Sequence, residues 1–262
     1  MKKTLRLFAN FLIKLFVNFR LLLYRTLNYD KEKLFIYTDS RGFEITKIHN
    51  RKNPFSSYIK YLIKNYRCYV FTAPEKHTTI FDFIDVYEKY RRRHNFKHVI
   101  AHIGVVDFSP RPISQIENIL LLKKNKIVKS FGQDLFYDIL NFKGYDQEYQ
   151  KEKTSAIAPE FLIPKVADVF SNIKNFVWIS CNPVDINWRG NYPKDRPANI
   201  NMVNDKSKAL ISLLKDVEII DLTDWDLNLV HKYTCDNIHF NQLGMKFLEQ
   251  EIIKIVKNEK NN

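Results

Sequence analysis

The sequence predicts a single three-layer α/β domain with a five-stranded parallel sheet, preceded by an amphipathic helix. Apolar, strand-like runs alternate with segments of helical periodicity along most of the 262 residues. This alternation is typical of a parallel sheet covered by helices on both faces. A hydrophobic content of 45% suits a globular chain, and only six glycines argue against a loop-rich all-β fold.

Residues 4–27 predict a helix with a broad apolar face and a narrow polar and basic stripe. The stripe consists of Arg6, Asn10, Lys14, Asn18 and Arg25. Charges inside the stretch disfavour a spanning helix, which needs about 20 mostly uncharged residues, and no small-residue cleavage site follows. We therefore expect residues 1–30 to lie on an anionic membrane surface, with Lys and Arg facing the head groups. The alternative is a helix that docks on a partner or on the domain itself.

The domain itself is expected to span residues 31–262. In its first half, apolar runs predict strands and apolar residues at helical spacing predict helices between them. The strands are expected at 34–37, 68–72 and 98–103, and the helices at 54–65 and 78–93.

The second half begins with weaker patterns. Residues 116–122 favour a helix, and the polar run at 143–154 predicts an exposed insertion or mobile loop, within an insertion near 123–158. Clear patterns then return, with a long polar loop at 182–199. The helices are expected at 159–174, 200–214 and 241–257, and the strands at 176–180 and 217–222.

The formal charge is +13, from 42 basic and 29 acidic residues. Such an excess attracts nucleic acid, anionic lipid or acidic glycan, but no nucleic-acid-binding motif accompanies it, so we expect no nucleic-acid partner. Cys68, Cys181 and Cys235 show neither metal-ligand spacing nor a disulfide framework, which favours a reducing compartment and no metal. We expect a cytoplasmic protein, peripheral at the inner face of the membrane.

Three motifs fall at predicted strand ends or just before the last helix. They are Asp39-Ser40, Gly104-Val105-Val106-Asp107 and Asp236-Asn237-Ile238-His239. Ligands bind at the carboxyl edge of open α/β sheets, and a serine there becomes a nucleophile when an oriented histidine takes its proton. Each residue alone has an ordinary explanation: Ser40 as a helix N-cap, His239 as a structural histidine, Asp236 as a turn residue.

The order and spacing of these motifs resemble the SGNH (GDSL-like) hydrolase superfamily over residues 33–257. Asn241-Gln242-Leu243-Gly244 continues the last motif as family members often do. The resemblance implies a flavodoxin-like α/β/α fold and no cofactor. It also implies that Ser40 is the nucleophile, His239 its general base and Asp236 the residue that orients the imidazole.

The chain departs from the family pattern in three places. Thr38 stands where a glycine usually precedes the Asp-Ser pair, and the glycine usual after the second strand is not visible within 73–78. Val106 stands where an asparagine usually donates to the oxyanion. Losing such a donor costs about 2.7–4 kcal/mol of transition-state stabilisation.

The backbone N–H groups of Ser40 and Gly104 remain as oxyanion donors. Asn182, Arg111 and Arg41 are candidates for the missing side-chain donor, although a loop salt bridge is an equally good explanation for Arg111. Two further acids are expected in supporting positions, with the second bracing the serine loop. These acids are Asp39 and Asp107.

The run Gly104-Val-Val-Asp-Phe-Ser-Pro-Arg111 looks like a variant found in SGNH-like proteins of bacterial surface-polysaccharide gene sets. This similarity implies an acylated carbohydrate substrate and an esterase or deacetylase. Two alternatives stay open: an O-acyltransferase on the same substrates, and a catalytically weak binding or scaffold protein in glycan assembly. Trp188, Arg189 and Tyr192 in the 182–199 loop form either a carbohydrate platform or ordinary loop packing.

Overall fold

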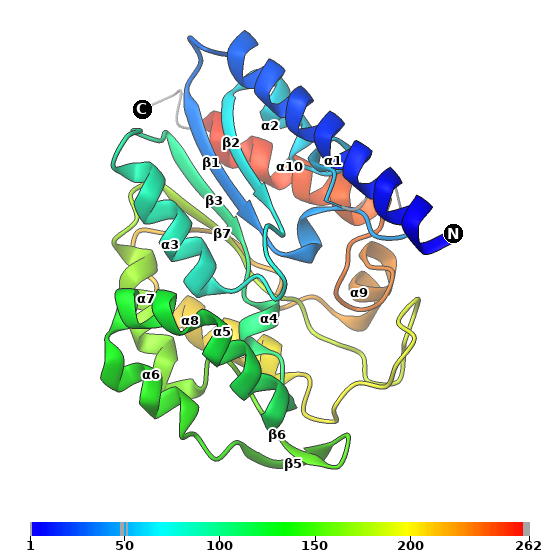
Figure 1. Ribbon diagram of the computed structural model, residues 1–262, viewed down its shortest axis with the longest axis vertical. Coiled ribbons are helices and arrows are strands. Elements are labelled where there is room, and N and C mark those ends of the chain that lie inside the picture. Colours follow the sequence, from blue (N-terminus) through cyan, green and yellow to red (C-terminus); the bar gives the residue numbers. More distant parts are fainter. Residues whose placement is uncertain (1, 48–49, 51, 259–262) are drawn as a thin grey trace.

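The predicted fold class is confirmed. The computed structural model describes residues 2–47, 50 and 52–258. Its main sheet has five parallel strands in the order β2-β1-β3-β7-β8 (Figure 1). The strands are β1 (Lys33–Thr38), β2 (Arg67–Thr72), β3 (His98–His102), β7 (Phe176–Ile179) and β8 (Glu218–Ile220).

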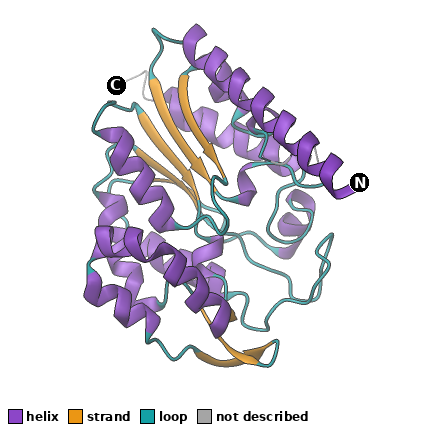
Figure 2. Cartoon of the chain, viewed as in Figure 1, coloured by secondary structure: helices purple, strands orange, loops and turns teal. Residues whose placement is uncertain are grey.

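Helices cover both faces of this sheet because its strands carry apolar residues on both sides (Figure 2). In β1, Phe35 and Tyr37 point into one core, and Leu34 and Ile36 point into the other. The first core is closed by α3 (Ile80–Arg91), α5 (Ile113–Phe131), α6 (Gln133–Leu140), α7 (Ile163–Ser171) and α8 (Met202–Leu213). The second core is closed by α2 (Lys60–Asn65) and α10 (Gln242–Asn258).

Several short elements lie between these. They are the 3-10 turns η1 (Ser40–Gly42), η3 (Pro54–Ser56) and η4 (Glu160–Leu162), and the helices α4 (Val105–Phe108) and α9 (Leu227–Tyr233). The sequence pattern did not predict α6 or α9.

The strand order creates a topological switch point. Numbered along the chain, the main-sheet order is 2-1-3-4-5, so the connections from β1 and from β3 leave the sheet in opposite directions. Ligand sites of open α/β folds lie outside the carboxyl ends of the two strands at such a point. Thr38 pairs with His102, which places Ser40 and Gly104 each two residues beyond a paired position.

The helix α1 (Lys2–Leu27) lies along β2 and α2 (Figure 1). Val17 is buried against the domain, the Arg20 guanidinium lies 3.9 Å from the Phe55 ring centroid, and Asn28 donates to the carbonyls of Ile63 and Tyr66. The opposite face exposes large apolar side chains to solvent. They are Phe11, Leu12, Leu15, Phe16, Phe19, Leu22, Leu23 and Leu27. None of the helices in the described ranges combines the length and hydrophobicity needed to span a membrane.

The polar run at 143–154 is largely exposed, as expected, but it is a hairpin instead of an irregular loop. It forms the hairpin of β5 (Tyr145–Tyr149) and β6 (Glu152–Ser155), which pairs with β4 (Arg111–Pro112) in a small antiparallel sheet. Thr154 and Ser155 are buried, and the buried Lys206 of α8 donates to the Tyr145 hydroxyl at 2.7 Å. These contacts order a segment whose composition alone favours a loop.

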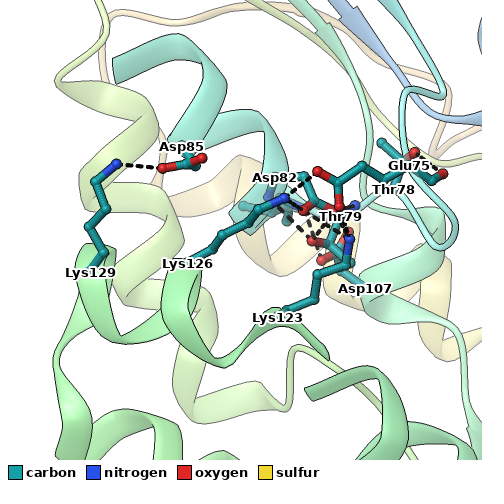
Figure 3. Close-up of polar contacts among 10 residues, drawn as sticks. Glu75, Thr78, Thr79, Asp82, Asp85, Asp107, Lys123, Lys126 and Lys129 are labelled. Atoms are coloured by element: carbon teal, nitrogen blue, oxygen red, sulfur yellow. Dashed lines mark hydrogen bonds and ion pairs between the residues drawn. The ribbon is translucent and has the colours of Figure 1, made fainter. Parts of the chain in front are cut away.

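A buried ionic cluster fastens α5 to α3 (Figure 3). The Asp82 side chain is fully buried and pairs with Lys123 at 2.8 Å and Lys126 at 2.6 Å. Glu75 pairs with the same two lysines. Asp82 also forms a capping box with Thr79 at the start of α3. In contrast, the pair of Lys129 with Asp85 is exposed.

Because removing one partner of a buried ion pair leaves the other charge poorly compensated, Lys123→Met is expected to lower the free energy of unfolding. With Lys126 still present, the loss should be near the low end of the usual range, about 3 kcal/mol. Urea unfolding followed by circular dichroism measures it. The matched Lys129→Met variant removes an exposed pair and should cost less than about 1 kcal/mol. Equal losses in the two variants would contradict the role of this cluster.

Candidate active site

The turn after β1 is held by a fully buried ion pair. Asp39 accepts hydrogen bonds from the backbone N–H of Arg41 at 2.9 Å and from its Nε and Nη2 at 3.0–3.2 Å. Arg41 Nη1 donates to the carbonyl of Ser180, at the end of β7. Burial alone would lower the pKa of Arg41, but the charge of Asp39 outweighs it and raises that pKa. The Arg41 guanidinium is therefore committed to the scaffold and is not the missing oxyanion donor.

Thr38 packs against the one glycine of this turn, Gly42. A Cβ on Gly42 would lie 2.0 Å from Thr38 Oγ1, so the close approach of the turn to the strand requires glycine at position 42.

The structure brings Ser40, His239 and Asp236 together across the chain. Ser40 Oγ lies 2.9 Å from His239 Nε2, and His239 Nδ1 lies 2.8 Å from Asp236 Oδ2. The other Asp236 oxygen accepts the backbone N–H groups of Ile238 and His239. Burial on its own would raise the pKa of Asp236, but the hydrogen bonds and charge of His239 bring it below its ordinary value.

An ionised carboxylate only accepts hydrogen bonds, so His239 Nδ1 carries the proton. His239 Nε2 is then free to accept the proton of the Ser40 hydroxyl. This is the arrangement of a nucleophile, a general base and an orienting acid.

Asn237 positions the turn between Asp236 and His239, and the sequence analysis did not assign it a role. Its backbone is left-handed, with φ 73°, a conformation that asparagine tolerates. Its side chain accepts from the N–H of Asp185 at 2.8 Å and donates to the carbonyls of Asp185 and Trp188. Asn237 therefore fastens the acid–histidine turn to the 182–199 loop. The left-handed preference of asparagine in a short turn is the sequence signal that marks it.

Two backbone N–H groups at the strand ends are candidates for the oxyanion hole. The N–H groups of Ser40 and Gly104, at the same register beyond β1 and β3, make no hydrogen bond within the described part of the chain. Gly104 has φ 121°, and a Cβ there would lie 3.0 Å from the Phe108 ring. Glycine is therefore needed for the backbone to present this N–H.

The side-chain candidates for the third donor differ in their availability. The Asn182 amide donates to the carbonyls of Pro183 and Asn237, at 2.7 and 2.8 Å, which uses both of its N–H groups. Arg111 is half-buried, and its guanidinium makes no hydrogen bond to any described residue. Of the residues named from the sequence, only Arg111 keeps free side-chain donors.

Asp107 does not hydrogen-bond to the serine turn within the described residues, in contrast to the expected bracing role. Its Oδ1 accepts the backbone N–H of Ile80 at 3.0 Å, at the start of α3 (Figure 3). Burial raises the pKa of Asp107 well above its ordinary value. Asp107 thus fixes α3 against α4 and supports the site only indirectly.

The three side chains of the 182–199 loop considered for a carbohydrate platform each contact another residue of the protein. The Trp188 ring lies 4.3 Å from the His231 ring, and Arg189 pairs with Asp195. Tyr192 instead lies under the Arg196 guanidinium, at 4.1 Å. No cluster of three or more His, Cys, Asp or Glu side chains placed to hold a metal ion occurs among the residues that the structure describes.

No family model matches the sequence, and no curated protein matches it significantly. Solved structures that resemble the chain include a lipase/acylhydrolase from Enterococcus faecalis, with 14% identity, coverage of 87% of this chain and 96% of that chain, and a TM-score of 0.46. An acetyl xylan esterase has 15% identity, coverage of 85% and 98%, and a TM-score of 0.44. An acetylxylan esterase from Geobacillus stearothermophilus has 12% identity, coverage of 86% and 94%, and a TM-score of 0.41. These values are too low to support a conclusion about function.

Proposed function

We propose that the chain is a serine-dependent acyl-ester hydrolase of the SGNH type that removes an acyl group from a carbohydrate. The observation that supports this most directly is the pair of contacts at 2.9 Å and 2.8 Å that link Ser40 to His239 and His239 to Asp236. The carbohydrate part of the proposal rests on the similarity of residues 104–111 to SGNH-like proteins of surface-polysaccharide gene sets.

In this reaction, Ser40 Oγ attacks the ester carbonyl while His239 Nε2 takes the hydroxyl proton. The negative charge on the carbonyl oxygen is held by the N–H groups of Ser40 and Gly104. The tetrahedral intermediate collapses, the sugar oxygen leaves with the proton from His239, and the acyl group stays on Ser40. Water then releases the acid by the reverse sequence of proton transfers. A sugar hydroxyl in place of that water would make the protein an O-acyltransferase, and analysis of the products with an added acceptor sugar separates the two.

A fluorophosphonate probe tests the nucleophile. We expect covalent labelling of the wild-type protein and none of Ser40→Ala, because the probe reacts only with a serine activated by a base. Gel fluorescence measures the labelling, and circular dichroism verifies that the variant is folded. Absence of labelling in folded wild-type protein, or equal labelling of Ser40→Ala, would favour the alternative of a binding or scaffold protein that has lost catalysis.

Val106→Asn tests the depleted oxyanion hole. We expect the amide to add a third donor and to raise kcat on 4-nitrophenyl acetate by about 10²-fold, since removing one such donor elsewhere costs about 10²–10³-fold. Val106→Leu, which changes size but adds no donor, is the matched control. A kcat that is unchanged or lower in a folded Val106→Asn variant would mean that another group already fills this role.

We further propose that α1 holds the protein on an anionic membrane surface at the inner face of the membrane. Eight large apolar side chains lie exposed on one face, and monomeric proteins rarely expose so large a patch without a function. The helix sequence Lys2–Leu27 contains basic residues and no acidic one, which favours anionic lipid over neutral lipid. The expected role of the basic stripe changes in part, because the Arg25 guanidinium lies 5.3 Å from the Tyr69 ring of β2. The apolar face itself therefore makes the proposed contact with the lipid.

A full-length variant with Phe16→Gln, Phe19→Gln and Leu22→Gln tests this contact. We expect its partitioning onto phosphatidylglycerol vesicles to fall at least about tenfold, because each apolar side chain buried in lipid contributes more than about 1 kcal/mol. Sedimentation with vesicles measures the partitioning. Leu121→Gln and Leu122→Gln on α5, which are also exposed, form the matched control. Unchanged partitioning would contradict the proposal. It would also be contradicted if the substitutions dissociated a dimer and left lipid binding intact, because the apolar face would then be a protein interface.

A further inference from the structure

Two half-buried arginines stand out because they form no ion pair with any acidic residue in the described part of the chain. Arg111 begins β4, and Arg196 lies in the 182–199 loop. Both side chains are half-buried, and neither forms an ion pair with a described residue. The Nε atom of each is sealed from solvent and has no hydrogen-bond partner within the described part of the chain. The donors open to a ligand are the Nη groups: none of them is among the sealed unpaired atoms, and only Arg196 Nη2 has a partner among the described residues.

The acidic residues nearby are already occupied. Asp195 pairs with Arg189, and the Asp236 carboxylate is taken by His239 and two backbone N–H groups. Asp107, whose charge acts on Arg111, is fully buried, and it accepts the backbone N–H of Ile80. The charges of Asp107 and Asp236 act on Arg111 and Arg196, respectively, but neither carboxylate forms an ion pair with these arginines within the described residues.

The two arginines share one neighbourhood. Burial lowers the pKa of both, while Tyr192 and Tyr149 act on both in the opposite direction. Tyr192 lies under Arg196, and the Tyr149 hydroxyl donates to the carbonyl of Asp195 at 2.7 Å. The hairpin β5–β6 and the 182–199 loop thus meet at the place where the guanidinium groups lie.

This place adjoins the proposed chemistry. Arg196 Nη2 donates to the backbone carbonyl of Asp236 at 2.5 Å, and the side chain of the same Asp236 orients His239. Arg196 is therefore linked through Asp236 to His239, the proposed general base for Ser40.

We propose that Arg111 and Arg196 together bind an anionic group, a carboxylate or a phosphate, on the carbohydrate that Ser40 deacylates. This inference rests on the proposed function and narrows it to acidic sugars. A guanidinium presents paired N–H donors that match the two oxygens of either anion, and it keeps its charge when half-buried. The net charge of +13 would also draw such a substrate toward the protein.

Binding to the full-length Ser40→Ala protein tests the inference without requiring catalysis. We expect D-glucuronate or D-glucose 6-phosphate to bind at least tenfold more tightly than D-glucose in titration calorimetry. Tighter binding of glucuronate identifies a carboxylate subsite, and tighter binding of the phosphate ester identifies a phosphate subsite. Arg111→Gln and Arg196→Gln, each added to Ser40→Ala, should each remove most of this preference. Lys194→Gln, which removes one exposed charge from the same loop, is the control and should retain it.

Binding of glucose as tight as that of both acidic sugars would overturn the inference, as would an equal effect of Lys194→Gln. Steady-state kinetics of the protein that retains Ser40 provide a second test. For O-acetylated glucuronate relative to O-acetylated glucose, the ratio of kcat/KM should fall at least tenfold in Arg111→Gln. An equal loss on both substrates would assign Arg111 to the oxyanion instead and would also overturn the inference. Loss of fluorophosphonate labelling alone would contradict the hydrolase proposal while leaving the calorimetric result intact, so the two failures are distinguishable.

Discussion

The geometry of the site depends on the buried ion pair between Asp39 and Arg41. It closes the turn after β1 on itself, and through the Ser180 carbonyl it joins the end of β1 to the end of β7. Breaking such a pair by removing one partner typically costs about 3–5 kcal/mol, because the remaining charge stays buried. Ser40 lies between Asp39 and Arg41 in the sequence. The ion pair between these two residues therefore fixes the backbone that positions the Ser40 hydroxyl, although it takes no part in the proposed chemistry. An exposed salt bridge, screened and flexible, could not hold a nucleophile in this way.

The fold and the candidate triad were predictable because both depend on short-range patterns. Each main-sheet strand is a short apolar run, and Ser40 and Gly104 follow two adjacent runs at one edge of the sheet, while Asp236 lies just before the last helix. The contact of 2.9 Å between His239 and Ser40 joins residues nearly 200 positions apart, so it depends on the whole fold. Periodicity was sufficient for the fold, whereas the roles of Ser40, His239 and Asp236 came from the resemblance of their motifs to the SGNH pattern.

The remainder depends on tertiary contacts that leave weak traces in the sequence. The hairpin at 145–155 has polar composition and is ordered by contacts such as that of Lys206 with Tyr145. The outward face of α1 could not be inferred from its polar stripe, because Arg20 and Arg25 pack on aromatic rings of the domain instead of facing solvent. Arg196 was missed because arginine in a polar loop is ordinary, and only the absence of an ion-pair partner among the described residues, together with its unpaired Nε, makes it notable.

The proposed membrane contact of α1 and the proposed anion site at Arg111 and Arg196 together concern how an acidic glycan would reach the protein. In Figure 1, α1 runs opposite to β1, so its N-terminal end lies on the side of the molecule where the strands end and the triad lies. With the apolar face of α1 on lipid, this edge would stand close to the membrane plane instead of pointing away from it. An anionic glycan held near an anionic surface is repelled by that surface, and a strongly basic protein offsets this repulsion. Under both proposals, the net charge of +13 would favour the contact with lipid and the binding of the substrate.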